Sequence, residues 1–123
     1  PDTRYNIMPN FGKDELLTTE QIDQVAAQVA SFSGLEGGAA TEEGAQVYAD
    51  NCAACHGETG EGLADLGGPS FTDPIWLYGN TLDAIKAQIG QPKHGVMPAW
   101  GARLGDPVVK QLAVYVHGLG GGQ

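Results

Sequence analysis

The sequence predicts an all-α protein. Apolar residues recur at helical spacing in four segments of the 123-residue chain, and no segment shows the sustained alternation of apolar and polar residues that indicates a strand. Each segment is preceded by a residue that can cap a helix or followed by a glycine that can end one. With 19 glycines and 7 prolines in the chain, long irregular connections are expected between the helices.

The first two predicted helices lie in the amino-terminal half, and each follows a threonine that can cap it. One covers about residues 19–32, and Thr18 with Gln21 can form a capping box at its start. The other covers about residues 42–52, with Thr41 as the expected N-cap and two glutamates in the first turn, where the helix dipole favours them. Their apolar faces are Ile22, Val25, Ala26, Val29 and Phe32 in the first helix and Ala45, Tyr48, Ala49 and Cys52 in the second.

The third and fourth predicted helices lie in the carboxyl-terminal half. The third covers about residues 82–89 after Asn80 or Thr81. The fourth is expected to be capped by Asp106, because Pro107 is then at the first helical position, where a missing N–H is not needed. The residues expected to face inward are Leu82, Ile85 and Ile89 in the third and Val108, Val109, Leu112, Ala113, Val116 and Leu119 in the fourth.

The charge of the chain limits its partners. Fifteen acidic residues against six basic ones give a net charge of −9, which disfavours nucleic acids and anionic membrane surfaces. The longest unbroken apolar run, residues 112–116, is far shorter than the roughly 20 residues that cross a bilayer. We therefore expect neither nucleic-acid binding nor a transmembrane segment in this chain.

A long irregular segment lies between the second and third predicted helices, at residues 57–79. A structureless loop of more than twenty residues is unusual in a compact domain. It becomes reasonable if the segment wraps a large prosthetic group.

The sequence also contains an internal repeat. Residues 7–12, Ile-Met-Pro-Asn-Phe-Gly, match residues 96–101, Val-Met-Pro-Ala-Trp-Gly, and an amphipathic helix follows each copy. Only the second copy is preceded by the long loop and a cysteine motif. We therefore predict two parts: residues 1–36 as the carboxyl-terminal remnant of one domain, and residues 37–123 as a complete second domain.

The cysteine motif carries the chemistry. Cys52-Ala-Ala-Cys55-His56 is the attachment pattern of c-type haem, in which two cysteines on one helical turn form thioethers and the adjacent histidine binds the iron. A thioredoxin-like site requires a βαβ context, and a zinc site needs further ligands that His94 and His117 could supply only awkwardly. We therefore expect one haem c, with His56 as its proximal ligand.

Four residues are candidates for the sixth iron ligand: Met97, Met8, His94 and His117. We favour Met97, because Pro98 fixes the backbone beside it and glycines nearby allow close approach to a ring. His94 would give a bis-histidine site, although its setting in a Lys-His-Gly turn favours solvent exposure. His117 is at the end of a predicted helix, where the helix dipole and packing explain a histidine.

Ligation by His56 and Met97 favours electron transfer. A six-coordinate iron has no vacant position for oxygen or peroxide, and a thioether ligand raises the reduction potential. A gas-binding sensor would require a labile Met97, and a peroxidase-like enzyme would require an open site with His94 as acid or base. We therefore expect an electron-transfer module that is not by itself an enzyme.

Over about residues 41–119, the chain resembles the class I cytochromes c, which are small all-α electron carriers. The resemblance rests on the motif at residues 52–56 and on Met97. It also rests on three residues where the terminal helices of that family cross: Gly44, Tyr48 and Tyr115. It implies that the carbonyl of Pro69 accepts a hydrogen bond from His56.

A closer resemblance is to the second haem domain of the dihaem cytochrome c subunit of cbb3-type haem–copper oxidases. It is carried by four strings, at residues 51–58, 71–79, 95–101 and 112–117. That subunit contains two cytochrome c domains in tandem, which would account for the repeat and make Met8 the axial ligand of the first domain. The chain departs from the family in having no membrane anchor and no first CxxCH motif.

The resemblance also implies surroundings for the haem and partners for the chain. It places Trp76, Tyr78 and Trp100 at the haem edge, in packing contacts or hydrogen bonds to propionates, and an ordinary aromatic core remains the alternative. It implies a donor cytochrome and, as acceptors, membrane oxidase subunits. The acidic surface of this chain would favour a basic donor. Covalent attachment of haem then places the domain on the periplasmic side of a bacterial inner membrane.

Overall fold

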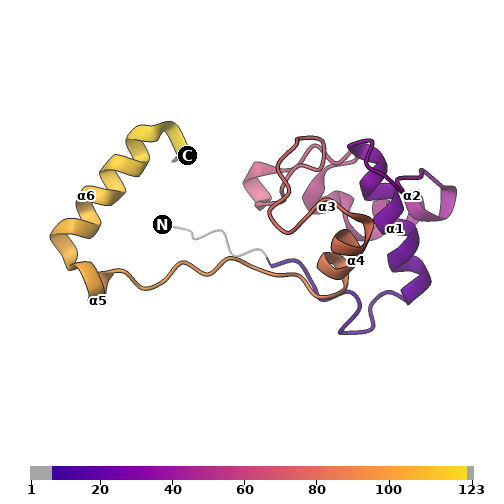
Figure 1. Ribbon diagram of the computed structural model, residues 1–123, viewed down its shortest axis with the longest axis horizontal. Coiled ribbons are helices and arrows are strands. Elements are labelled where there is room, and N and C mark those ends of the chain that lie inside the picture. The colour runs from indigo at the N-terminus through magenta and orange to yellow at the C-terminus, as the bar shows by residue number, and fades with distance from the viewer. Residues whose placement is uncertain (1–6, 122–123) are drawn as a thin grey trace. The chain divides into compact units, whose positions relative to one another are not determined.

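A computed structural model describes residues 7–121, and every regular element in this range is helical (Figure 1), which confirms the all-α prediction. The closest approach to a sheet there is a single antiparallel bridge between Leu63 and Gly68. The elements are α1 (Thr19–Phe32), α2 (Glu42–Asn51), α3 (Ala53–His56), η1 (Ala64–Leu66), α4 (Leu82–Gly90), α5 (Gly101–Leu104), α6 (Asp106–Val116) and η2 (His117–Gly121).

Three predicted caps are confirmed. Thr18 and Gln21 form the expected capping box at the start of α1, and each side chain accepts a hydrogen bond from the other residue's backbone N–H. The hydroxyls of Thr41 and Thr81 accept hydrogen bonds from the third residues of α2 and α4. These side chains satisfy N–H groups that have no partner within the helix, which is why the predicted starts are correct.

The predicted helix over residues 42–52 is confirmed as α2, which ends at Asn51, and Cys52, with a φ of −120°, separates it from α3. One predicted cap was wrong. The N-cap of the last long helix is Gly105, so Asp106 is the first residue of α6 and not its cap. Pro107 is nevertheless in the first turn of α6, as its missing N–H requires.

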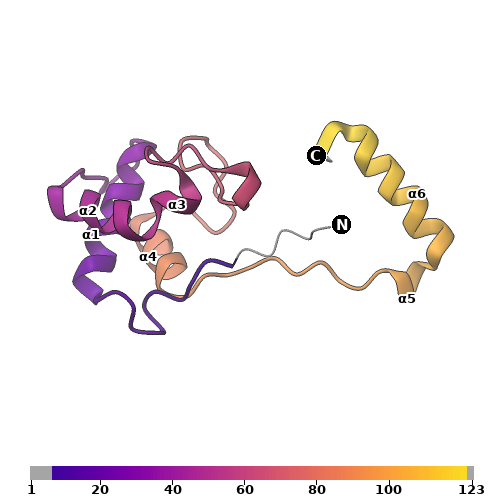
Figure 2. The same ribbon diagram turned by 180° about the vertical axis from the view of Figure 1, so that it is seen from behind.

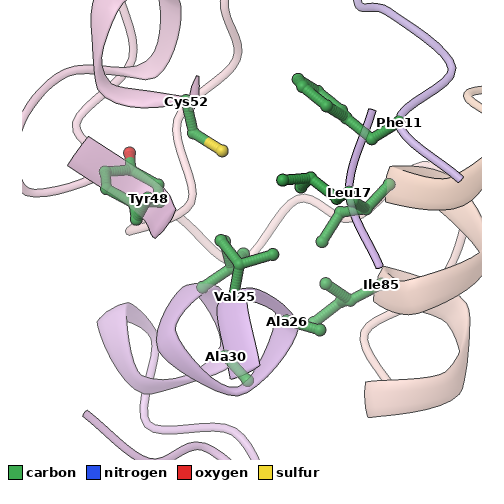
Figure 3. Packing of buried hydrophobic residues seen from close by; sticks show 10 residues of the cluster. Phe11, Leu17, Val25, Ala26, Ala30, Tyr48, Cys52 and Ile85 are labelled. Carbon is green, nitrogen blue, oxygen red and sulfur yellow. The ribbon is translucent and has the colours of Figure 1, made fainter. Parts of the chain in front are cut away.

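The described chain divides into two compact units after Lys93. In the first unit, α1 lies against both α2 and α4, as the two views of the ribbon show (Figure 2). Lys86 on α4 also forms an ion pair with Asp23 on α1, at 2.8 Å. The buried core between these helices and the amino-terminal loop is drawn in Figure 3 and consists of Phe11, Leu17, Val25, Ala26, Val29, Ala30, Tyr48, Cys52, Ile85 and Ile89.

The contact between α1 and α2 is close at Gly44. A Cβ atom built on Gly44 would be 2.7 Å from the carbonyl oxygen of Gln24, so only glycine lets the two backbones approach this far. Further along, Phe32 packs edge-on against the ring of Tyr48, with 5.0 Å between ring centroids. Helix α1 therefore covers the face of α2 that contains Gly44 and Tyr48. The family resemblance assigns this same face to the contact with Tyr115.

The second unit contains α5, α6 and η2. None of the residues of α6 is buried, and Val114 and Tyr115 are 73% and 65% exposed. Because this unit is described by itself, the inward-facing apolar side of this helix stays a prediction. The crossing of Tyr115 with Gly44 stays a prediction.

Within residues 7–121, no helix combines the length and the apolar character that a membrane span requires. The predicted boundary near residue 36 concerns descent from tandem domains. Packing of α1 on α2 does not test that descent, and the boundary stays a prediction.

Candidate functional site

One turn of helix brings together the three residues of the cysteine motif. Cys52 is the C-cap of α2 and precedes α3, Cys55 lies within α3, and His56 is the last residue of α3. The backbone N–H groups of Cys55 and His56 both donate to the carbonyl of Cys52, at 3.1 and 3.0 Å. Cys52 and His56 are buried and Cys55 is half-buried. The fold therefore presents two thiols and an imidazole as one compact donor set.

His56 has a fixed orientation. Its Nδ1 lies 3.0 Å from the carbonyl oxygen of Pro69, and because a carbonyl can only accept, Nδ1 carries the proton. The other ring nitrogen, Nε2, is then the basic one. Burial lowers the pKa of His56, although the bond to Pro69 acts in the opposite direction. The imidazole is therefore neutral at neutral pH, which is the form that binds a metal.

The loop that holds Pro69 closes tightly over α3. The backbone N–H of Gly62 donates to the carbonyl of His56 at 2.7 Å, and Leu63 and Gly68 exchange two backbone hydrogen bonds. A Cβ atom built on Gly68 would be 1.8 Å from the carbonyl oxygen of Cys55. Glycine is thus required at this position for the loop to reach His56.

Sequence reasoning missed Phe71. Its ring stacks on the imidazole of His56, with 4.4 Å between centroids and 24° between planes, and Trp76 stacks on Phe71 at 6.1 Å. The backbone of Phe71 is held by a hydrogen bond to the carbonyl of Gly60 at 2.7 Å. Phe71 is two positions after Pro69 in the sequence, and that separation is not one that marks a ring stacked on a histidine. Trp76, which was predicted, is half-buried within this stack.

Tyr48 connects the helical core to the site. Its buried hydroxyl donates to the carbonyl of Gly57, the residue after His56, at 2.7 Å. Burial raises the pKa of Tyr48 above its usual range, and the nearby Cys52 and Glu61 act in the same direction. The hydroxyl therefore remains a hydrogen-bond donor at physiological pH.

Burial also raises the pKa of Cys52 to about 11, and the nearby Cys55 contributes. A thiol with such a pKa is a poor nucleophile at neutral pH, which does not fit the thioredoxin-like alternative. Among residues 7–121, no group of three or more His, Cys, Asp and Glu side chains is arranged to hold a metal ion.

The remaining predicted site residues are exposed or lie in the second unit. Tyr78 is 41% exposed in the first unit. Met97 is 82% exposed in the second unit, and Trp100 precedes α5 with the guanidinium of Arg103 4.8 Å from the centre of its ring. The relation of Met97 and Trp100 to His56 stays a prediction. His94 and His117 are exposed.

The donor set fits a haem c. Two thiols three residues apart and an imidazole whose Nδ1 is already bonded match what two thioethers and one iron bond require. This fit rests on the chemistry of the side chains and on the orientation of His56.

Comparisons with known proteins agree with this chemistry. A family model described as cytochrome c oxidase, cbb3-type, subunit III matches residues 39–116. The cbb3-type cytochrome c oxidase subunit FixP of Sinorhizobium medicae is 53% identical over 123 residues, and the subunit CcoP of Cereibacter sphaeroides is 50% identical over 123 residues. Each alignment covers 99% of this chain and 42% of the relative, so the chain spans less than half the length of these proteins.

Proposed function

The chain belongs to the cbb3-type cytochrome c oxidase subunit III family, and from that premise we propose that it carries single electrons toward a membrane-bound terminal oxidase. The observation that carries the proposal is the bond between His56 Nδ1 and the Pro69 carbonyl, because it leaves Nε2 as the nitrogen for an iron. The family relation and the Cys52-Ala-Ala-Cys55-His56 motif agree with this use of the histidine.

In this proposal Cys52 and Cys55 hold haem c covalently and His56 is its proximal ligand. When bound, the haem supplies a one-electron couple. The chain's own residues orient and contact the histidine that would bind the iron. Pro69 fixes the tautomer of His56, and Phe71 stacks on one side of the imidazole.

We propose Met97 as the sixth ligand and Trp76, Tyr78 and Trp100 as residues at the haem edge. A thioether closes the last coordination position, which excludes oxygen and peroxide and leaves electron transfer as the chemistry. The Pro98 that follows Met97 restricts the backbone there, which supports this assignment. The chain is then an electron-transfer module, and reduction of oxygen belongs to other subunits.

Partners and location follow from the same proposal. The net charge of −9 favours a basic donor cytochrome, and subunits of the membrane oxidase are the acceptors. Covalent attachment of haem places the domain on the periplasmic side of a bacterial inner membrane. We also propose that residues 1–36 correspond to the end of a preceding cytochrome c domain, because residues 7–12 repeat residues 96–101.

The test compares the haem-loaded chain with two variants, Cys55→Ala and His56→Ala. The wild type should keep its haem under denaturing conditions, show a low-spin spectrum with the weak near-infrared band of Met-ligated ferric haem, and give one reversible one-electron wave. Cys55→Ala should retain a single thioether, seen as a red shift of the reduced pyridine adduct. His56→Ala should lose the low-spin spectrum.

A chain that acquires no covalent haem during maturation would overturn the cofactor assignment. A high-spin wild type that binds carbon monoxide rapidly would overturn the ligation and support the gas-binding alternative.

A further inference from the structure

Two methionines occur in the chain, and they differ in burial and in the unit to which they belong. Met8 is half-buried and packs against the core cluster that contains Cys52. Met97 is 82% exposed and belongs to the second unit. The methionine that is folded into the same unit as His56 is therefore Met8, which the family resemblance assigns to another haem.

The segment around Met8 is anchored to this unit. Phe11 is 6% exposed, and the N–H of Leu17 donates to its carbonyl at 3.0 Å. The N–H groups of Gly12 and Lys13 both donate to the carbonyl of Gly90, at 3.1 and 3.0 Å. Figure 3 shows Phe11, Leu17 and Cys52 directed into one core. Met8 is thus held by a loop fixed at several points.

The internal repeat relates the loop that contains Met8 to the segment that contains Met97, the predicted thioether ligand. Met8 precedes α1 and Met97 precedes α6, each within an apolar-Met-Pro segment. Helix α1 lies on α2 at Gly44 and Tyr48, the residues that the resemblance assigns to the crossing with the carboxyl-terminal helix. Met8 therefore precedes the helix that packs on α2, and Met97 holds the corresponding place before α6 in the repeat.

We propose that Met8 is an alternative sixth ligand of the iron bound by His56, used when α1 occupies the face of α2 at Gly44 and Tyr48. This inference rests on the proposed function and extends it. Exchange of one thioether for the other at the iron moves no electron and no proton, so it needs no further reactant.

The contact of α1 with α2 includes a buried polar atom without a hydrogen-bond partner. One substitution should therefore strengthen this contact, and another should weaken it. Gln28 on α1 is 7% exposed, and its Oε1 is buried without a hydrogen-bond partner. In the register that aligns Val25 with Leu112, Gln28 corresponds to Tyr115. A buried acceptor without a partner weakens the position of α1. Gln28→Leu should strengthen it, and Phe32→Ala, which removes the contact with Tyr48, should weaken it.

The experiment uses the haem-loaded chain labelled with [13C]methyl methionine, together with Met8→Ala, Met97→Ala and the double variant. In the ferrous protein, the ring current of the haem moves the methyl resonance of a bound methionine far upfield. We expect Met97→Ala to retain one upfield methyl resonance, from Met8, and the near-infrared band in its ferric form. The double variant should lose both signals.

The outcomes separate this inference from the proposed function. If Met97→Ala loses the upfield resonance while the wild type and Met8→Ala retain it, Met97 ligation stands and the inference about Met8 is wrong. If the wild type has no upfield methionine resonance, methionine ligation itself is wrong.

The role of α1 is tested in the Met97→Ala background by displacing the thioether with imidazole. Gln28→Leu should raise the imidazole concentration at half-displacement by roughly fivefold or more, and Phe32→Ala should lower it. Leu16→Ala, at a position 56% exposed, is the matched control and should leave it unchanged. Equal midpoints in all four proteins would overturn the link between Met8 and α1.

Discussion

At the residue scale, Tyr48 joins the helical core to the residue after His56. Its hydroxyl donates to the carbonyl of Gly57 at 2.7 Å, and both residues are buried. Tyr48→Phe should lower the free energy of unfolding by about 1 to 2 kcal/mol, because a buried carbonyl then loses its donor while the ring contact with Phe32 remains. Urea unfolding of the haem-loaded chain measures this.

Glu61 should make the protein sensitive to acid. Hydrogen bonds from its own backbone N–H and from the N–H and hydroxyl of Thr59 hold the pKa of this carboxyl below its ordinary value of 4.5. A carboxyl with a lower pKa in the folded state contributes stability above its unfolded pKa, and that contribution is lost as the pH falls through the folded value.

Glu61→Gln should therefore remove part of the loss of stability between pH 7 and pH 3. The measurement is the urea midpoint of wild type and variant at both pH values. Glu58→Gln on the same loop is the control. If the wild type and Glu61→Gln lose the same stability on acidification, the hydrogen bonds of this carboxyl do not matter for folding.

The sequence indicated the candidate site residues whose proposed chemistry depends on spacing. Cys52, Cys55 and His56 follow from their separation along one helical turn, and Pro69 followed from the family resemblance. Phe71 was missed because stacking on an imidazole requires only an aromatic ring brought there by a loop, and no fixed spacing marks such a ring. The path of the loop depends on backbone bonds such as that from Phe71 to Gly60, which leave no pattern in the sequence.

At the element scale, the crossing of α1 and α2 depends on Gly44. Alanine is normally favoured over glycine within a helix by about 1 kcal/mol. Here its Cβ atom would be 2.7 Å from the carbonyl oxygen of Gln24, so the helices would have to separate. Gly44→Ala should therefore destabilise the fold by about 1 to 3 kcal/mol despite the better helix propensity.

Gly90→Ala is the matched control for that prediction. Gly90 is the last residue of α4, and a Cβ atom built on it has no heavy atom within 4 Å. It should be neutral or slightly stabilising in thermal unfolding of the haem-loaded chain. If Gly44→Ala matches or exceeds Gly90→Ala in stability, the close approach of α1 and α2 does not limit the fold.

The helix starts were predictable where a side chain provides the cap. Thr18, Thr41 and Thr81 mark the starts of α1, α2 and α4 because their oxygens complete the first turn. The break at Cys52 left no such signal, since the apolar face of α2 continues through this residue. Asp106 resembled a cap, yet Gly105, with a φ of 75°, makes the turn into α6.

At the scale of the whole molecule, periodicity identified the helices but not their neighbours. Helices α1 and α6 share one apolar spacing, so the sequence alone does not decide which of them contacts a given helix. Packing of α1 on α2 and α4 was therefore beyond sequence reasoning, although each helix was predicted. The repeat that made the pairing ambiguous is also what gives Met8 and Met97 equivalent places in the chain.

The net charge of −9 acts on the molecule as a whole and should control the rates at which it meets charged redox partners. A negative surface concentrates cations and repels anions over a distance that salt shortens, from about 30 Å at 0.01 M to about 3 Å at 1 M.

A cationic cobalt complex should therefore oxidise the ferrous protein about tenfold or more faster at low salt than an anionic complex of similar potential and size. The ratio of the two rates should fall toward one as the salt concentration rises, whereas a neutral oxidant should show little change. Stopped-flow absorbance across a salt series measures all three rates. Rates that are equal for the two charged complexes, or independent of salt, would show that the acidic surface does not steer partners to the haem, and the proposed preference for a basic donor would have to be abandoned.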